Sequence, residues 1–406
     1  MLKFIQSLVC ALATTFVSAS HGVGLDEIVE SALSHPSLKL SRSQSVVAGY
    51  DLEAAKWAQF PTLSYESFSK DKLADSTSVK LEQPIWSGGA IDAGIEGAEY
   101  SYKAADAAIL EARLKAVRNV GSAYVELSRA NEQLQETREN IAKLQELEKT
   151  IKNRVDAKIS PKSEWITVYA RISQAESQAD QIKGAIARLK TKIAELTDIQ
   201  IDTTNRLSCE LPMYVKDSDL QANAEKYSPT LLRLDLQKSA NQAGVDKAKA
   251  EFYPRVTVGI ENVKDNAFSL DGDPSAFVAL RYTLSDGLSA NSNLASAREK
   301  VATAAHEYEI SRRALVEEVQ TLLERYRASE NQVRPLYALV ESNWLLIDSF
   351  LAQYKVGNKS WLDVVNAQRE YYQSVMSLID VLGDRCAAAF ELQTLSGQTF
   401  VAESKS

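Results

Sequence analysis

The chain repeats itself, and this internal duplication constrains its fold more than any other feature. Residues 35–65 align without a gap on residues 228–258 at an offset of 193, so that Pro61 corresponds to Pro254. Two later matches follow, 86–88 with 285–287 at an offset of 199 and 160–163 with 357–360 at an offset of 197. We therefore expect two copies of one structural unit, at 20–197 and 220–398, joined by a linker at 198–219 and followed by a tail at 399–406.

Each copy predicts a pair of strands followed by two long helices. Proline lacks the amide hydrogen and blocks helical geometry before it, so Pro61 and Pro254 should end the short helices that open each copy. Alternating apolar and polar residues then predict strands. No proline occurs between Pro84 and Pro161, and apolar residues from Trp165 onward step by three and four, the spacing of a coiled coil. We expect strands at about 62–86 and 255–285, and long helices at about 89–158, 161–197, 288–356 and 361–395.

These helices should form rods. A single helix over 89–158 has 70 residues and, at 1.5 Å per residue, a length of about 105 Å. In the second copy, Pro335 should kink the outgoing helix without ending it. Glycine and proline, which turns require, number only 16 and 9 in 406 residues. That scarcity favours few, long elements.

Charge and motif content exclude several classes of function. The chain carries 46 basic and 54 acidic side chains, a net charge of −8, so we expect no nucleic-acid partner. Its three histidines have no metal-binding or catalytic spacing, and no glycine-rich phosphate loop occurs. The many carboxylates lie among lysines and arginines at helical spacing, which indicates a solvated surface. We therefore predict a protein that is not an enzyme and has no cofactor and no metal site.

The N-terminus has the pattern of a secretory signal. An apolar run from Phe4 to Val17 and the small residues after it predict a signal peptide at 1–19, cleaved after Ala19. Beyond residue 20, no apolar stretch is long enough for a membrane-spanning helix. In an exported chain Cys209 and Cys386 can form a disulfide, or both can remain as buried thiols; the sequence leaves both alternatives open.

The strands suggest another kind of membrane contact. Nine to eleven residues, the expected strand length, is also the length of a tilted transmembrane strand. Four strands cannot close on themselves, and lipid does not tolerate an open sheet edge, so strands that enter a membrane require several chains. A soluble sheet with packed aromatic residues is the alternative. Aromatic residues that could form interfacial girdles cluster here: Phe60, Tyr65, Phe68, Trp86, Phe252, Tyr253, Phe268, Phe277 and Tyr282.

Several stretches in a fixed order carry a resemblance to a known family. They are the duplicated Pro61 and Pro254 junctions, residues 84–89 at the return from strand to helix, and residues 354–370. Over about residues 25–398 the chain resembles the TolC family of outer-membrane channel proteins. The resemblance implies a mainly α fold with a small transmembrane β part, in which three chains form a 12-stranded β-barrel continued by an α-helical barrel in the periplasm. It also implies a location in the outer membrane of a Gram-negative bacterium.

Residues 354–370 correspond to the periplasmic tip of that family. The resemblance implies that Tyr354, Lys359 and Asp363 tie the closed entrance of the tunnel. Asp363 also has a plainer explanation, because Ser360 and Asp363 have the spacing of a helix-capping box. Many relatives have an arginine where this chain has Lys359, and a lysine cannot make the fork-shaped contact of an arginine. We therefore expect weaker contacts at the closed entrance of this chain than in those relatives.

The resemblance also implies docking sites for a periplasmic adaptor at both tips. The corresponding residues are Ile159, Ser160, Val356 and Gly357, for which simple helix termination is the alternative. In the first copy Ser160 replaces the turn glycine, and Pro161 is expected at the first helical position. We therefore expect the two tip turns to differ.

The implied function is a passive outer-membrane conduit within a tripartite export system. Residues 86–94 and 359–370 resemble the branch of the family that serves type I secretion of large proteins, including adhesins. This resemblance implies a homotrimer that lies in outer-membrane lipid and works with a periplasmic adaptor and an inner-membrane ABC transporter. The alternative cargo is a drug or another small molecule. A periplasmic adaptor and a soluble coiled-coil scaffold are the other classes; an adaptor would have one hairpin between glycine-rich halves, and a scaffold would need no signal peptide.

Overall fold

The computed structural model of the protein describes residues 25–70, 74–201, 217–264, 274–282 and 289–397. The signal peptide at 1–19, most of the linker at 198–219, Cys209, Phe268 and the tail at 399–406 lie outside the described residues. The helices are α1 (Leu25–Ala32), α2 (Pro36–Trp57), α3 (Ala90–Asp156), α4 (Lys162–Thr197), α5 (Asp217–Tyr227), α6 (Pro229–Ala250), α7 (Ser289–Lys355) and α8 (Trp361–Leu395). The strands are β1 (Thr62–Lys70), β2 (Ala74–Trp86), β3 (Arg255–Lys264) and β4 (Ser275–Arg281).

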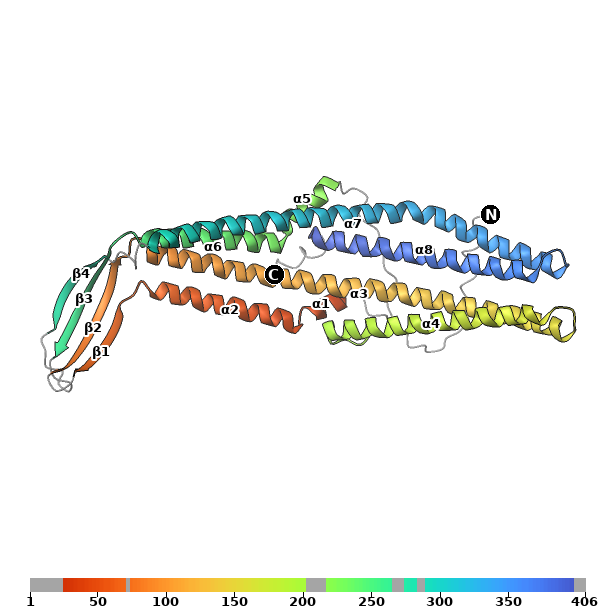
Figure 1. Ribbon diagram of the computed structural model, residues 1–406, viewed down its shortest axis with the longest axis horizontal. Coiled ribbons are helices and arrows are strands. Elements are labelled where there is room, and N and C mark those ends of the chain that lie inside the picture. Colours follow the sequence, from red (N-terminus) through yellow and green to blue (C-terminus); the bar gives the residue numbers. More distant parts are fainter. Residues whose placement is uncertain (1–24, 71–73, 202–216, 265–273, 283–288, 398–406) are drawn as a thin grey trace, which may run out of the picture.

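The chain forms a long helical body with a small sheet at one end (Figure 1). Helices α3 and α7 have 67 residues each, which corresponds to about 100 Å. The shorter helices lie end to end beside them, α2 and α4 along α3, and α6 and α8 between α3 and α7 (Figure 1). The two loops at the far end from the sheet join α3 to α4 and α7 to α8. The predicted class, mainly α with two pairs of strands, is confirmed.

Local sequence explains where the helices begin and end. Pro36 and Pro229 occupy the first helical positions of α2 and α6, where a missing amide hydrogen costs nothing. Both helices end a few residues before Pro61 and Pro254, as the duplication predicts. Helix α7 continues through Pro335.

The four strands form one antiparallel sheet in the order β1-β2-β3-β4. Thr62 pairs with Glu82 in the β1–β2 hairpin, and Arg255 pairs with Arg281 in the β3–β4 hairpin. Side chains alternate between two faces along each strand. One face carries exposed apolar side chains, including Leu63 (69% exposed), Val278 (74%) and Leu280 (69%). The opposite face carries Ser64, Lys80, Glu82, Glu261 and the two arginines.

The core is a series of apolar clusters along the helices. One cluster joins α1, α3 and α4 around Tyr124 and Leu127, and a second joins α5, α7 and α8 around Leu322 and Leu392. A third joins both hairpins close to the tip and includes Ile151 and Trp361. The third cluster therefore packs the two copies against each other near the tip.

Candidate functional site at the helical tip

The turn between α7 and α8 is a compact helix stop followed by a capped helix start. Gly357 has a φ of 83°, a left-handed conformation that glycine adopts without steric cost. The Asn358 amide donates to the Gln353 carbonyl at 2.9 Å, which satisfies the end of α7. Ser360 then caps α8, and its hydroxyl accepts from the Asp363 amide at 3.2 Å.

Asp363 completes this cap. Its Oδ2 atom accepts from the Ser360 amide at 3.1 Å and from the Ser360 hydroxyl at 2.7 Å, so both halves of a capping box are present. The Ser360 hydroxyl and amide stabilise the carboxylate and lower the pKa of Asp363. The carboxylate is therefore charged at neutral pH and is held at the start of α8.

The turn between α3 and α4 has the same backbone geometry, which corrects the sequence alignment. The left-handed residue here is Lys158, with a φ of 59°, and the Ile159 amide donates to the Arg154 carbonyl at 2.8 Å. Lys158, not Ser160, thus corresponds to Gly357, at an offset of 357 − 158 = 199. Pro161 is the residue before α4 and not its first helical residue. The expectation that the two turns differ is wrong for the backbone and correct only for the side chains.

A cluster of three side chains lies close to these turns, where the two hairpins meet: Arg154 of α3, Glu164 of α4 and Tyr354 of α7. The guanidinium carbon of Arg154 lies 5.0 Å from the ring centre of Tyr354, a cation–π contact between α3 and α7. The Tyr354 hydroxyl and the Oε2 atom of Glu164 are both buried without a hydrogen-bond partner among the described residues. Burial raises the pKa of the Tyr354 phenol, with Arg154 opposing this shift and Glu164 adding to it. Sequence reasoning did not identify Arg154 or Glu164.

Glu164 faces this cluster because of the residue that precedes its helix. It lies three positions after Pro161, as Asp363 lies three positions after Ser360. Proline has no amide hydrogen to donate, so the capping box that holds Asp363 cannot form around Glu164. An acidic residue three positions after a proline cap is the signal that could have identified it.

No hydrogen bond or ion pair among the described residues links the three predicted gate residues to one another. Tyr354 packs toward the α3–α4 hairpin, whereas the Lys359 ammonium lies 4.3 Å from the ring centre of Phe350 on α7. Asp363 is engaged with Ser360. The charge of Lys359 still acts on Asp363, since it helps to lower the pKa of that carboxyl group.

The docking residues expose apolar surface at both tips. Val356 is 71% exposed and Ile159 is 65% exposed, and Gly357 is exposed as well. Ser160 is half-buried instead, since its hydroxyl accepts from Nε of Arg154 at 3.4 Å. The structure thus brings the predicted residues to the same end of the molecule with unequal accessibility.

The seam between the two hairpins changes character with distance from the tip. Next to the tip, the apolar cluster around Ile151 and Trp361 fills it. Farther from the tip it is polar: the Gln368 amide donates to the Asn140 side chain at 3.0 Å, and a cavity of about 510 Å³ lies between α3, α4 and α8. Farther still, Phe390 packs on Gly121, where an added Cβ would lie 1.9 Å from the ring. The seam between the two hairpins therefore has a polar stretch with a cavity between two tightly packed apolar stretches.

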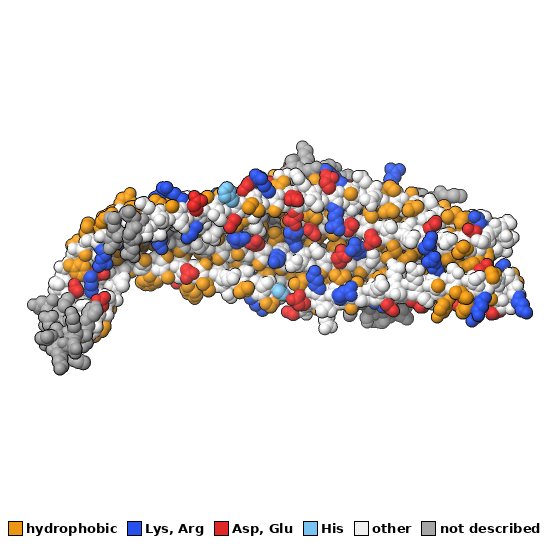
Figure 2. Space-filling model, viewed as in Figure 1, with side chains coloured by type: hydrophobic (Ala, Val, Ile, Leu, Met, Phe, Trp, Pro, Cys, Tyr) orange, Lys and Arg blue, Asp and Glu red, His pale blue; other side chains and the backbone are white. Residues whose placement is uncertain are grey.

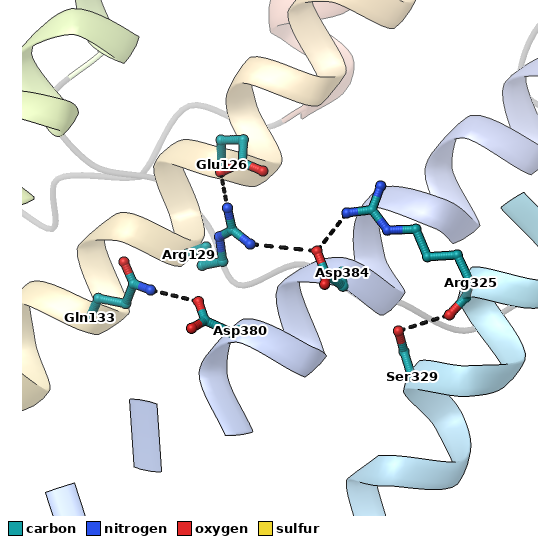
Figure 3. Close-up of polar contacts among 7 residues, drawn as sticks. All are labelled: Glu126, Arg129, Gln133, Arg325, Ser329, Asp380 and Asp384. Atoms are coloured by element: carbon teal, nitrogen blue, oxygen red, sulfur yellow. Dashed lines mark hydrogen bonds and ion pairs between the residues drawn. The ribbon is translucent and has the colours of Figure 1, made fainter. Parts of the chain in front are cut away.

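A charged network lies between the polar stretch and the apolar stretch farther from the tip (Figure 3). Asp384 of α8 lies between Arg129 of α3, at 3.5 Å, and Arg325 of α7, at 2.6 Å. Arg129 also pairs with Glu126. The Arg129 stem crosses α8 at Gly383, where an added Cβ would lie 2.5 Å from it. Burial raises the pKa of the neighbouring Asp380, which accepts from Gln133 at 2.7 Å.

Other features of the described chain offer no second site. No group of histidine, cysteine and carboxylate side chains in the described residues has an arrangement that would hold a metal ion. None of the helices described is both long and apolar enough to cross a membrane. Acidic and basic side chains are intermixed along the helical body (Figure 2). Cys386 is disulfide-bonded, but Cys209 lies outside the described residues, so their pairing stays a prediction.

Comparisons with known proteins agree with this architecture. The family model described as "Outer membrane efflux protein" matches residues 28–197 and 220–398. No curated protein matches the chain. A membrane protein from Pseudomonas aeruginosa superposes with a TM-score of 0.82 at 20% identity, covering 92% of this chain and 90% of that one.

Two further solved structures are similar. The outer membrane protein VceC from Vibrio cholerae gives a TM-score of 0.79 at 17% identity, covering 92% of this chain and 96% of that chain. The CmeC outer membrane channel from Campylobacter jejuni also gives 0.79, at 13% identity, covering 92% of this chain and 85% of that one. At these identities the superpositions establish the fold.

Proposed function

This chain belongs to the outer membrane efflux protein family, and from that membership we propose that three copies of it form one passive conduit through the outer membrane and into the periplasm. The family consists of outer-membrane channels and not of enzymes, as predicted. The trimer, its partners and its cargo are the steps proposed here. Energy for transport comes in this proposal from an inner-membrane ABC transporter that is coupled through a periplasmic adaptor.

The main support for a trimer is the four-stranded sheet. In the single chain, the outer edges of β1 and β4 have no strand partner among the described residues, and one face of the sheet is apolar and exposed. An open edge beside an apolar face cannot persist in lipid, because unpaired amide and carbonyl groups there cost several kcal/mol each. Pairing β4 of one chain with β1 of the next removes every open edge, and three chains give 3 × 4 = 12 strands.

The helical body has two unpartnered edges of the same kind. On α2, apolar side chains are exposed at Leu40, Val47, Tyr50 and Trp57. At the opposite edge of the layer, α7 exposes Ile310, Tyr337, Trp344 and Leu345. Two different edges of one molecule that both need covering suit a head-to-tail contact, which closes into a ring of identical subunits.

Extraction and mass measurement test this proposal. The protein extracted from outer membranes in detergent should have the mass of three chains by light scattering, and it should form water-filled pores in planar bilayers. A matched variant is Val278→Asp, which places a charge on the apolar face of the sheet and should prevent membrane insertion. A monomer in the soluble fraction, or a trimer without conductance, would contradict the proposal.

At the tip, we propose that Tyr354, Lys359 and Asp363 contribute to the closed state together with Arg154 and Glu164. The support is the contact of Arg154 with Tyr354, which ties the two hairpins of one chain. The exposed Ile159 and Val356, with Gly357 and the half-buried Ser160, are the proposed contacts of the adaptor. Crosslinking from a photoreactive residue at position 159 or 356 should capture the adaptor, and the same residue at position 313 on α7 should not.

For the cargo, we propose secreted protein, on the resemblance of residues 86–94 and 359–370 to the type I secretion branch. Efflux of drugs or other small molecules is the competing proposal. Deleting the gene separates the two: loss of one or more large proteins from the medium with unchanged drug sensitivity supports secretion. Increased drug sensitivity with an unchanged set of secreted proteins supports efflux and removes the secretion proposal.

A further inference from the structure

Two arginines lie side by side at the end of the sheet nearest the helices. Arg255 is the first residue of β3, Arg281 is the last of β4, and the two are direct cross-strand partners. Cβ atoms in such a pair are about 4.5–5.5 Å apart, and like charges directly opposite one another are destabilising. Both side chains are exposed, and neither makes an ion pair with any residue that the structure describes.

The pair lies on the polar face of the sheet. Along β3, Arg255 shares a face with Thr257, Gly259 and Glu261, and Arg281 points away from the exposed apolar side chain of Leu280. In the proposed trimer the apolar face contacts lipid, so the arginine pairs face the water-filled interior.

The internal duplication shows that this charge is particular to the second copy. At offsets of 193 and 199, Arg255 and Arg281 correspond to Thr62 and Glu82, which also pair directly across their hairpin. The Glu82 carboxylate is 2.8 Å from the Lys80 ammonium, so its charge is compensated within the sheet. At the corresponding positions, the first copy thus has its acidic charge paired with a lysine, and the second carries two cations that have no ion-pair partner among the described residues.

We propose that the Arg255–Arg281 pairs of three chains form a ring that binds polyanionic groups where the strand part meets the helical tunnel. This inference rests on the proposed trimer, in which two arginines per chain give six guanidinium groups facing one aqueous space. A guanidinium binds phosphate and carboxylate oxygens through two parallel hydrogen bonds, and several such groups in a narrow channel reinforce one another. The ligand class is a molecule or segment with several phosphates or carboxylates.

Block of single-channel current by tripolyphosphate tests the ring. Added on the strand side of the trimer in a planar bilayer, tripolyphosphate reaches the ring without passing the tip, and it should block the wild-type pore. The double variant R255Q/R281Q should weaken this block roughly tenfold or more, because charge-assisted contacts are lost. Raising the salt from 0.1 to 1 M should weaken the wild-type block, since the screening length falls from about 10 to about 3 Å.

Two matched variants complete the test. Thr62→Arg adds one cation per chain at the corresponding position of the first copy and should strengthen the block. Arg313→Gln removes the same charge from an exposed side chain on α7 and should leave the block unchanged. Equal block of R255Q/R281Q and the wild-type pore would overturn the inference, as would a double variant that changes only insertion into anionic-lipid bilayers. The absence of any conducting pore would count against the proposed conduit instead.

Discussion

The turn after α3 and the turn after α7 follow the same backbone path with different residues. Each has a left-handed residue, Lys158 or Gly357, followed by the start of a return helix. The difference lies in how the acidic residue of the next turn is held. Asp363 is fixed by its cap, whereas Glu164, behind a proline, is turned toward Tyr354 and the opposite hairpin.

A duplicated tip can thus divide two tasks between its copies. The second copy supplies a capped, charged carboxylate, and the first supplies the cation, Arg154, that contacts the opposite hairpin. Substitutions that affect one tip and not the other can therefore test the division.

The largest effect is expected from removing the cation that joins the hairpins. Arg154→Ala deletes the contact with the Tyr354 ring, which contributes about 0.5–2 kcal/mol, a roughly 2- to 30-fold change in the ratio of open to closed tips. Single-channel conductance should rise, because Glu164 and Tyr354 lose the group that faces them. Lys152→Ala, at an exposed position two residues earlier, is the matched control. If both variants conduct like the wild type, Arg154 has no part in closing the tip.

A smaller effect is expected from two substitutions of Asp363, which distinguish the role of its charge from its role in capping α8. Asp363→Ala removes both, so it should raise conductance, weaken cation preference and increase hydrogen exchange in the first turn of α8. Asp363→Asn keeps an acceptor for the cap and should weaken cation preference alone. Glu164→Gln should change cation preference less, because one oxygen of that carboxylate, Oε2, is buried. Identical reversal potentials for wild type and Asp363→Asn would leave Asp363 only its capping role.

Much of this fold could be predicted from the sequence, because its signals are long and repeated. The paired prolines predict where α2 and α6 end. Apolar residues that recur alternately every three and every four positions extend over α4. Strand alternation identifies both hairpins. These patterns succeed because each is set by local backbone geometry and recurs in both copies.

The tip could be predicted less well, for identifiable reasons. The sequence aligns Ser160 with Gly357 because the residues around them are similar. The left-handed conformation of Lys158, with a φ of 59°, could not be predicted, since lysine rarely adopts it. Arg154 and Glu164 lie among many charged residues at helical spacing, and only packing between two hairpins distant in sequence distinguishes them. The family resemblance identified Tyr354 but not Arg154 and Glu164, which lie beside it.

Exchanging the left-handed residues should shift the two turns in opposite directions. Lys158→Gly relieves a conformation that costs a non-glycine residue about 1 kcal/mol, so exchange of the Ile159 amide should slow roughly fivefold. Gly357→Ala imposes that cost at the other tip, and the Asn358 amide should exchange faster by a similar factor. An added Cβ at Gly357 has no atom within 4 Å, so steric clash does not contribute. Changes of the same sign at both tips would contradict the shared backbone geometry.

The smallest expected effect is a response to acid that only the second tip shows. The Ser360 hydroxyl and amide lower the pKa of Asp363 from its ordinary value of 3.8, so the cap contributes stability above that pH and loses it as the pH falls through the lowered value. Hydrogen exchange, corrected for its intrinsic dependence on pH, should therefore show the first turn of α8 losing protection below about pH 4. The first turn of α4 should not change in this way, because Pro161 cannot form the cap. Asp363→Asn serves as the control, since it cannot titrate; a wild-type response that persists in this variant would assign the acid sensitivity to another group.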